Sequence, residues 1–300
     1  MLSTTHLLDI DDLSEADVHT VLDRAAALKA GEDEARLPQK TLGMIFEKPS
    51  TRTRTSFETG MTRLGGHAVY LGPDDIHLGH GEPIKDTSRA LSRYVDAVMA
   101  RLFDHGDVEE LAAYADVPVI NGLTDAAHPC QTLADLLTIR EQFGFDTRVA
   151  WVGDGNNVGQ SFALGCALVG IDLTVATPKG YGMDGSVLAR AADLGAAPDV
   201  VDTPEAAVED ADVVYTDVFV SMGEEGEREE KLTAFDGYQV NADLLAHASE
   251  ETKVMHCLPA HRGEEITDEV LESDRAIVWD QAENRMHAQN GLLVELLAGD

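Results

Sequence analysis

The stretch Arg148-Val-Ala-Trp-Val-Gly-Asp-Gly-Asn-Asn-Val-Gly159, with the apolar run Phe162–Ile171 behind it, decides the fold. A segment of strand character ends in a glycine turn, and a helix-length apolar segment begins directly after the turn. This is the start of a βα unit, and the same alternation continues in both directions along the chain. The sequence therefore predicts an α/β protein built on parallel sheets.

Strand-length apolar runs alternate with helical segments over nearly all 300 residues. We expect strands at Thr41–Phe46, Ala68–Leu71, Ala97–Ala100, Val117–Asn121, Arg148–Gly153, Leu173–Thr177, Val213–Asp217, Lys253–Cys257 and Ala276–Trp279. The clearest helical patterns lie at Glu15–Ala30, Arg52–Leu64, Thr87–Tyr94, Cys130–Gln142, Val158–Leu168, Gly185–Leu194 and Arg285–Leu297.

The length of the chain favours two domains, because a single hydrophobic core rarely grows beyond ~250 residues. A long helical pattern ends at Phe143-Gly144, and a new strand begins at Arg148. We therefore predict one doubly wound parallel-sheet domain over residues 1–143 and a second over 144–283, with the active site in the cleft between them. The last helix, about 284–300, is expected to pack back on the first domain.

The charge of the chain is strongly negative, with 55 acidic against 22 basic residues and a net charge of −33. Such a chain repels phosphate backbones and acidic membranes, so neither nucleic acid nor a membrane is an expected partner. The acid is dispersed along the sequence, lysine is scarce and aromatic residues make up 5%. This pattern indicates a halophilic protein, in which salt screens the self-repulsion; the alternative is an ordinary acidic enzyme.

The compartment is predicted from cysteines and from the N-terminal segment. Cys130, Cys166 and Cys257 have no CxxC spacing and cannot all pair, so neither a disulfide framework nor a structural zinc site is expected. The first residues lack a basic segment of a signal peptide, and Phe162–Ile171 is too short to span a bilayer. We expect a cytoplasmic protein.

The loop after the first strand has the residues of an anion cradle. Ser50-Thr-Arg-Thr53 combines hydroxyl groups, an arginine and the amides of a helix N-terminus. Around it, Lys40–Arg63 holds five basic residues against two acidic ones, a basic island in an acidic chain. The alternative is a well-capped surface helix with solvent-facing arginines.

Two further segments could complete this site, because ligands of doubly wound sheets bind beyond the carboxyl ends of the strands. Arg101 ends a strand and would project toward the cradle, although such an arginine is often a rim salt bridge. His128-Pro-Cys-Gln131 opens a helix, and its imidazole and amide could donate to a carbonyl oxygen that gains charge. His128 alone could equally be a structural cap.

The turn at Gly153–Gly159 has the spacing GxGxxxG, a weaker dinucleotide signal than GxGxxG. The next strand ends without the acidic residue that would hold a ribose, and the two asparagines would crowd a pyrophosphate. We interpret the glycines as fold geometry and Asn157 as a polar substrate contact. A nicotinamide-dependent oxidoreductase is the alternative from another enzyme class.

Two strand ends in the second half suit an amino-acid substrate. Asp217, followed by Ser221-Met-Gly223, could face a cationic amine. His256-Cys-Leu-Pro259 brings a thiol to the next strand end. Neighbours on a strand point to opposite faces, so we do not expect Cys257 to be a covalent nucleophile paired with His256; a buried small hydrophobe is the alternative for the thiol.

Taken together, these segments and Glu283-Asn-Arg-Met-His287 resemble the aspartate/ornithine carbamoyltransferase family, with matches in order from Phe46 to Gln289. Ser50-Thr-Arg-Thr53 and His128-Pro-Cys-Gln131 are similar to elements of both branches. Ser221-Met-Gly223 and His256-Cys-Leu-Pro259 resemble the ornithine branch. The resemblance implies transfer of a carbamoyl group from carbamoyl phosphate to L-ornithine, giving L-citrulline and phosphate in arginine biosynthesis or breakdown.

The resemblance also implies residue roles. The carbamoyl phosphate contacts would be Ser50, Thr51, Arg52, Thr53, Arg101, His128, Gln131, Cys257, Leu258 and Arg285. The catalytic set would be Arg52, Thr53, Arg101, His128 and Cys257. The ornithine contacts would be Asn157, Asp217, Ser221 and Met222.

The resemblance further implies homotrimers with shared sites and a reaction without metal or cofactor. His77 stands where the family commonly has a glutamine, in a segment that in relatives reaches a neighbouring subunit's site. A non-catalytic anion-binding relative is the remaining alternative.

Overall fold

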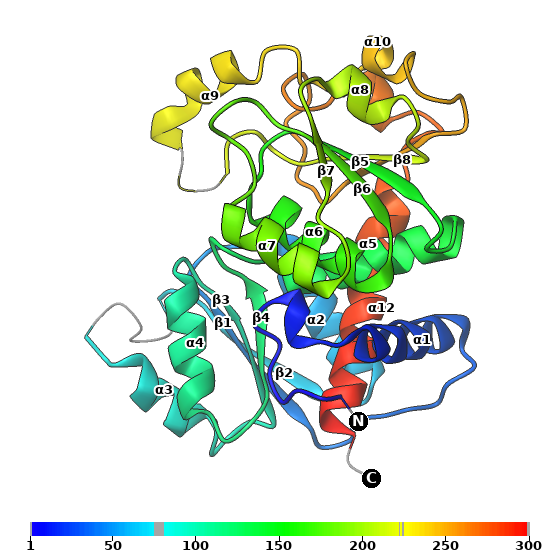
Figure 1. Ribbon diagram of the computed structural model, residues 1–300. Helices are drawn as coiled ribbons and strands as arrows, with labels where there is room; N and C mark the ends of the chain where they lie inside the picture. The colour runs from blue at the N-terminus through cyan, green and yellow to red at the C-terminus, as the bar shows by residue number, and fades with distance from the viewer. Residues whose placement is uncertain (1, 75–80, 222, 224, 299–300) are drawn as a thin grey trace. The chain divides into compact units, whose positions relative to one another are not determined.

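The structure is a computed structural model that describes residues 2–74, 81–221, 223 and 225–298 (Figure 1). The described residues divide into two compact units. Unit 1 comprises Met1–Leu137 and Glu283–Asp300, and unit 2 comprises Thr138–Ala282. Helix α5 (Pro129–Gln142) crosses the division in sequence, so the units divide within this helix, whereas the sequence-based boundary falls after its end.

Unit 1 contains, within its described residues, a four-stranded parallel sheet in the order β2-β1-β3-β4. The strands are β1 (Thr41–Phe46), β2 (His67–Leu71), β3 (Ala97–Arg101) and β4 (Val119–Leu123). The helical elements are η1 (Ile10–Asp12), α1 (Glu15–Ala30), α2 (Thr51–Arg63), α3 (Ile84–Leu91), α4 (His105–Tyr114), the first part of α5 and most of α12 (Val278–Leu297). Ile45, Val98 and Val119 form the sheet side of a core cluster that helix α4 covers through Val108 and Leu111.

Unit 2 contains, in the part of the chain that is described, a five-stranded parallel sheet in the order β7-β6-β5-β8-β9. The strands are β5 (Arg148–Val152), β6 (Asp172–Ala176), β7 (Asp199–Val201), β8 (Val213–Thr216) and β9 (Lys253–His256). The remaining helical elements are α6 (Asn157–Val169), α7 (Gly185–Leu194), α8 (Pro204–Val208), η2 (Glu225–Glu227), α9 (Arg228–Ala234), α10 (Ala242–Leu245) and α11 (Asp268–Leu271).

The doubly wound α/β prediction is confirmed, since both sheets are parallel and reverse their strand order once. In unit 1 the reversal lies between β1 and β3, and in unit 2 it lies between β5 and β8. Ligands of such sheets bind at this point, beyond the carboxyl ends of the strands. The topology therefore directs attention to the loops that follow these four strands.

Local sequence fixes the ends of the long helices. Ser14 and Asp17 form a reciprocal capping box at the start of α1, and Gly31 ends the helix in the left-handed region at φ 73°. The structure gives α1 and α7 the bounds that their sequence patterns predict. Gly291 of α12 lies against Val21 and Ala25 of α1, so the C-terminal helix packs within unit 1.

The strand predicted at Ala276–Trp279 is wrong. Only residues just before Val278 pair with β9: Val254 donates its N–H to the Arg275 carbonyl, and Ile277 donates to Val254. Helix α12 then begins at Val278. The β-branched run has strand composition, but tertiary context decides the conformation of so short a segment. The short strand β7 was not predicted.

The glycine turn after β5 is explained by close packing. Gly153 has φ 138°, a value that side-chain-bearing residues avoid. A Cβ on Gly155 would lie 2.4 Å from the backbone nitrogen of Met183, and one on Gly159 would lie 2.8 Å from the Trp151 ring. All three glycines thus serve the fold, which removes the main support for a dinucleotide site.

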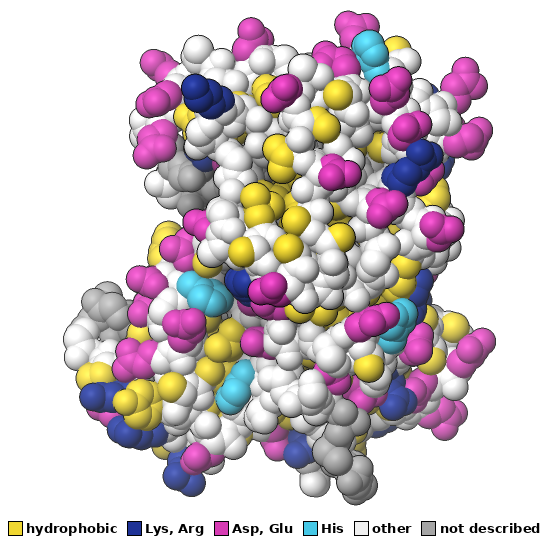
Figure 2. Space-filling model, in the orientation of Figure 1, with side chains coloured by type: hydrophobic (Ala, Val, Ile, Leu, Met, Phe, Trp, Pro, Cys, Tyr) yellow, Lys and Arg dark blue, Asp and Glu magenta, His cyan; other side chains and the backbone are white. Residues whose placement is uncertain are grey.

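Acidic side chains are dispersed over the visible face in Figure 2, with few basic ones between them. No helix in the described ranges is long and apolar enough to cross a membrane.

We predict that Gly159→Ala destabilises unit 2 by about 1–3 kcal/mol, because the added methyl group overpacks a buried ring. Trp151 is fully buried and contacts the rings of Phe162 and Tyr215, so it cannot move aside easily. Urea denaturation at fixed KCl measures the change. Gly185→Ala is the control, since its added methyl group meets no atom within 4 Å. Equal effects of the two substitutions would contradict this account.

Candidate functional site

The N-terminus of α2 forms an anion cradle in unit 1. Ser50 is the N-cap, and its hydroxyl accepts a hydrogen bond from the Thr53 N–H at 3.2 Å. The first-turn amides of a helix and its positive dipole end favour an anion here. Thr51 is exposed, Arg52 is half-buried, and Thr53 is buried.

Arg54, the residue after the anion cradle Ser50–Thr53, has a different environment. Its guanidinium pairs with Glu58 at 3.0 Å and lies 3.8 Å from the centroid of the Tyr70 ring. The guanidinium of Arg54 is thus already paired with a carboxylate and an aromatic ring on the helix surface. Arg52, which is half-buried, stays the predicted donor for a ligand at the helix end.

Arg285 of α12 connects three predicted site residues of unit 1. Its guanidinium donates to the Gln131 side-chain oxygen, lies 3.4 Å from the Nε2 atom of His128, and donates to the Thr53 hydroxyl at 3.4 Å. The Gln131 amide donates in turn to Asp135 at 2.7 Å, which fixes its orientation. The network joins α2, α5 and α12 over more than 200 residues of sequence, as the separation of 232 between Thr53 and Arg285 shows.

His128 is buried and electrically neutral in this environment. Burial, together with the guanidinium groups of Arg285 and Arg101, holds the pKa of His128 well below its usual value. Arg285 can only donate, so the Nε2 atom of His128 accepts and its proton lies on Nδ1. Arg101, the last residue of β3, is itself only 5% exposed.

Asp217, directly after β8, is the centre of the predicted site residues in unit 2. The Cys257 thiol donates to one of its oxygens at 3.0 Å, and the Asn156 amide donates to the other at 2.9 Å. Asp217 is buried, so these two donors hold the carboxylate in one orientation. The structure thus joins the loops after β5, β8 and β9.

Asn156, to which sequence reasoning gave no site role, donates from its side-chain amide to Asp217 at 2.9 Å. It is the N-cap of α6, and its oxygen accepts from the N–H groups of Val158 and Gly159 at 3.0 and 3.1 Å. Asn157 is the first helical residue, and its own side-chain oxygen accepts from Val158 N–H. The cap preference of asparagine was the available signal for Asn156.

Ser221 is half-buried and follows Asp217 in the same loop. Met222, a predicted ornithine contact, and His77 lie outside the described residues.

In the turn after β9, the side chains of His256 and Cys257 bond to different partners, although ligand atoms of the two lie within 4.8 Å of one another. Cys257 bonds to Asp217, whereas the Nε2 atom of His256 lies 3.0 Å from a carboxylate oxygen of Glu265. Leu258 has φ 59°, and its N–H donates to the Nδ1 atom of His256 at 2.9 Å. No Cys/His pair forms in this turn.

A buried ion pair near the β5 turn was also missed from sequence. The Lys231 ammonium lies 2.8 Å from Asp154, and both side chains are at least nine-tenths buried. Their separation of 77 residues leaves no local signal. The pair fixes α9 to the turn that carries Asn156.

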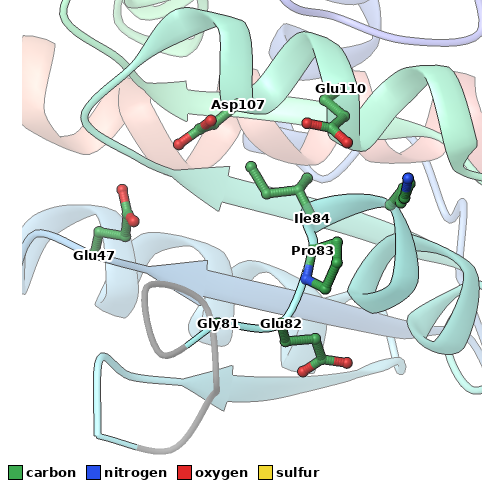
Figure 3. Close-up of a pocket in the computed structure, with 8 residues that line it drawn as sticks. Glu47, Gly81, Glu82, Pro83, Ile84, Asp107 and Glu110 are labelled. Carbon is green, nitrogen blue, oxygen red and sulfur yellow. The ribbon is translucent and has the colours of Figure 1, made fainter.

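Unit 1 has a cavity of about 470 Å³ that is not the anion cradle. Figure 3 shows the residues that line it. Its lining residues are Glu47, Gly81, Glu82, Pro83, Ile84, Lys85, Asp107 and Glu110. Burial, reinforced by neighbouring carboxylates, raises the pKa of Asp107. So acidic a lining disfavours an anionic ligand.

Two groups of described side chains have the composition of a metal site: Asp217, His256 and Cys257, and His261, Glu264 and Glu265. In the first group both ring nitrogens of His256 are engaged, and the thiol is bonded to the carboxylate. Those internal bonds satisfy the donor atoms that a cation would need. The second group is considered below.

Comparison with known proteins agrees with this geometry. Residues 5–141 match the carbamoyl-P binding domain of aspartate/ornithine carbamoyltransferase, and residues 146–296 match its Asp/Orn binding domain. The chain belongs to the aspartate/ornithine carbamoyltransferase family.

Relatives and solved structures in this carbamoyltransferase family cover almost the whole chain. An ornithine carbamoyltransferase of Haloquadratum walsbyi is 69% identical over 300 residues, 99% of each chain. The solved ornithine carbamoyltransferase of Pyrococcus furiosus has a TM-score of 0.94 at 50% identity, over 98% of this chain and 97% of that one. The structure from Gloeobacter violaceus has a TM-score of 0.90 at 47% identity, over 99% and 100%.

We predict that His128 makes the free energy of unfolding fall as the pH drops below about 6.5. In that range the imidazole binds a proton in the unfolded chain but not in the native state, where its pKa is lowered. The slope due to this residue approaches about 1.4 kcal/mol per pH unit, and stability is retained above that range. Urea denaturation at several pH values, at constant KCl, compares the chain with His128→Gln. His6 and His287 also have lowered pKa values, but they contribute equally to both proteins. Identical pH slopes would refute the prediction.

Proposed function

We propose that the chain transfers the carbamoyl group of carbamoyl phosphate to the δ-amine of L-ornithine, giving L-citrulline and phosphate. The observation that carries the proposal is the hydrogen-bonded set of Arg285, Gln131, His128 and Thr53 beside the N-terminus of α2. It gathers donors for a carbonyl oxygen next to an anion cradle. Membership of the family supports both substrates.

Carbamoyl phosphate binds to unit 1, in this proposal. Its phosphate accepts from the hydroxyl groups and first-turn amides of Ser50–Thr53 and from the fork of Arg52. Its carbonyl oxygen faces Thr53, Arg101 and the Nδ1–H of neutral His128, while Gln131 positions the carbamoyl amide. A neutral His128 stabilises the carbonyl by donating a hydrogen bond, without a charge that would hold the substrate too tightly in its ground state.

Ornithine binds to unit 2 through Asp217, with Ser221, Met222 and Asn157 as further contacts. Asp217 orients the amine but does not deprotonate it, because a neighbouring carboxylate favours the charged form. The δ-amine, with a lysine-like pKa of about 10, loses its proton before attack. Cys257 and Leu258 shape the region where the amine meets the carbamoyl carbon.

The reaction is an acyl substitution. The amine nitrogen forms a bond to the carbamoyl carbon, and the carbonyl electrons move to oxygen to give a tetrahedral oxyanion. Each well-placed donor lowers the barrier by about 3–4 kcal/mol. The C–O bond to phosphate then breaks, Arg52 and the helix terminus stabilise the leaving dianion, and phosphate takes the amine proton. The electrons and protons balance between the two substrates, so this scheme includes no cofactor.

Incubation of the purified chain with carbamoyl phosphate and ornithine in concentrated KCl should give citrulline. Arg52→Ala should lower kcat/KM at least about 100-fold, the loss expected when one preorganised donor to developing charge is removed. Arg54→Ala is the matched control, since Glu58 and Tyr70 already engage that guanidinium. Turnover of another amine in place of ornithine would assign a sister specificity, and full activity of Arg52→Ala would overturn the site.

Asp217→Asn should raise the KM for ornithine about 10–100-fold, because a hydrogen bond to a charged group contributes about 1.5–3 kcal/mol. The KM for carbamoyl phosphate should stay unchanged. Asp243→Asn, an exposed carboxylate at the start of α10, is the control and should alter neither constant. A uniform fall in kcat with both KM values constant would remove Asp217 from the ornithine contacts.

We also propose that the chain forms homotrimers and is adapted to high salt. Support comes from its net charge of −33 and from exposed aromatic side chains of unit 1, including Tyr94 and Phe103. Sedimentation across a KCl series should find the mass of three chains at molar salt. In dilute buffer, unscreened repulsion should dissociate or unfold the assembly. A trimer equally stable in dilute buffer would contradict the salt adaptation, and a monomer at molar salt would contradict the trimer.

A further inference from the structure

The segment after the β9 turn brings together one imidazole and two carboxylates in unit 2. The donor atoms of His261, Glu264 and Glu265 all lie within 4.8 Å of one another. The three residues have no role in the reaction described above. Their chemistry is nevertheless that of a cation site.

Glu265 is the fixed member of this group, with an exposure of 0%. One of its oxygens, Oε1, accepts from the His261 backbone N–H at 2.5 Å and lies 3.0 Å from the Nε2 atom of His256. Its other oxygen, Oε2, is buried and has no hydrogen-bond partner among the described residues. Such an atom normally finds a partner, because burial without one is costly.

Two atoms of the neighbouring side chains also lack hydrogen-bond partners within the described ranges. The Nδ1 atom of His261 and the Oε2 atom of Glu264 are also buried and make no hydrogen bond to any described residue. The two atoms are 3.8 Å apart. Each of the three side chains thus has one buried atom without a hydrogen-bond partner in the described chain, and ligand atoms of the three meet within 4.8 Å.

The charge balance of the group also calls for a cation. The Nδ1 atom of His256 accepts from the Leu258 N–H, and its Nε2 atom lies 3.0 Å from Glu265. Glu264 is paired through its Oε1 atom with Arg228. That pairing leaves the buried carboxylate of Glu265 without an arginine or lysine partner among the described residues. A buried carboxylate is stable when it is paired or coordinates a metal.

We propose that His261, Glu264 and Glu265 bind a divalent transition-metal cation, with Zn²⁺ as the best fit. An imidazole with two carboxylates suits zinc and its neighbours, whereas magnesium and calcium prefer oxygen ligands alone. Ligand bonds to zinc are about 2.0–2.2 Å, so the donor atoms must draw closer together. His261 and Glu264, whose side chains are 40% and 22% exposed, have the freedom to do so around the fixed Glu265.

The proposed cation site stabilises the turn after β9 in unit 2 and takes no part in the reaction. His256 donates to Glu265 and accepts from Leu258, which carries φ 59° next to Cys257. Outer partners of this kind orient a metal ligand and tune it. A cation on Glu265 would therefore fix the turn through His256.

Zinc titration of the full chain tests the proposal. Protein stripped with a chelator, in the Cys257→Ala background to remove thiol binding, is titrated with Zn²⁺ against a chromogenic chelator. One equivalent per chain should bind, and His261→Ala and Glu264→Gln should each weaken binding at least tenfold. His247→Ala, an exposed histidine of the same unit, is the control and should bind as before. Because His261 and Glu264 are partly exposed, these variants should fold where a Glu265 substitution could fail.

Two further measurements separate this site from the thiol-containing group at Asp217. Co²⁺ bound to the unsubstituted chain should show ligand-field bands without the charge-transfer band of a cobalt–thiolate bond. Zn²⁺ should raise the Tm of the chain but not that of His261→Ala. Unaltered zinc affinity in His261→Ala, binding that disappears only with Cys257, or no binding at all would each overturn the proposal.

Discussion

The buried guanidinium of Arg285 is the interaction on which the carbamoyl half depends. It holds Thr53, Gln131 and His128, which come from the start of α2 and the start of α5. Burial, and in addition this positive charge and that of Arg101, hold the pKa of the His128 imidazole well below its usual value. One side chain thereby sets the geometry of the donors and contributes to the protonation state of one of them. Removing it would leave a buried polar cluster without its common donor, a more damaging change than the loss of a single contact.

This positive cluster exists in a protein whose surface is overwhelmingly acidic. The two properties are compatible because they act over different distances. Exposed carboxylates are screened within a Debye length, about 10 Å at moderate salt and less in concentrated brine. Buried arginines are shielded from that screening, so their field remains strong at short range. High salt can thus screen the repulsion among surface carboxylates without weakening the attraction for an anion at the helix end.

Sequence predicts those parts of the molecule that depend on local patterns. Strand β1 and helices α1 and α7 have the predicted bounds, because apolar periodicity and caps within the segment decide them. The strand prediction for Ala276–Trp279 was wrong, because helix α12 begins within this run despite its strand-like composition. Ser50 and Asp217 were proposed as site residues because they stand directly after a strand within a motif. Asn156, Lys231 and Glu265 were not, because each acquires its role from a partner in another segment.

Asn156 illustrates how strongly one position can be constrained. Its oxygen caps α6, while its amide nitrogen holds Asp217. Serine, threonine and aspartate cap helices about as well, but a hydroxyl cannot span both tasks as an amide does, and a carboxylate would repel the one it faces. The usual tolerance of a capping position is therefore lost here. The site and the helix share a single side chain, so neither can vary independently of the other.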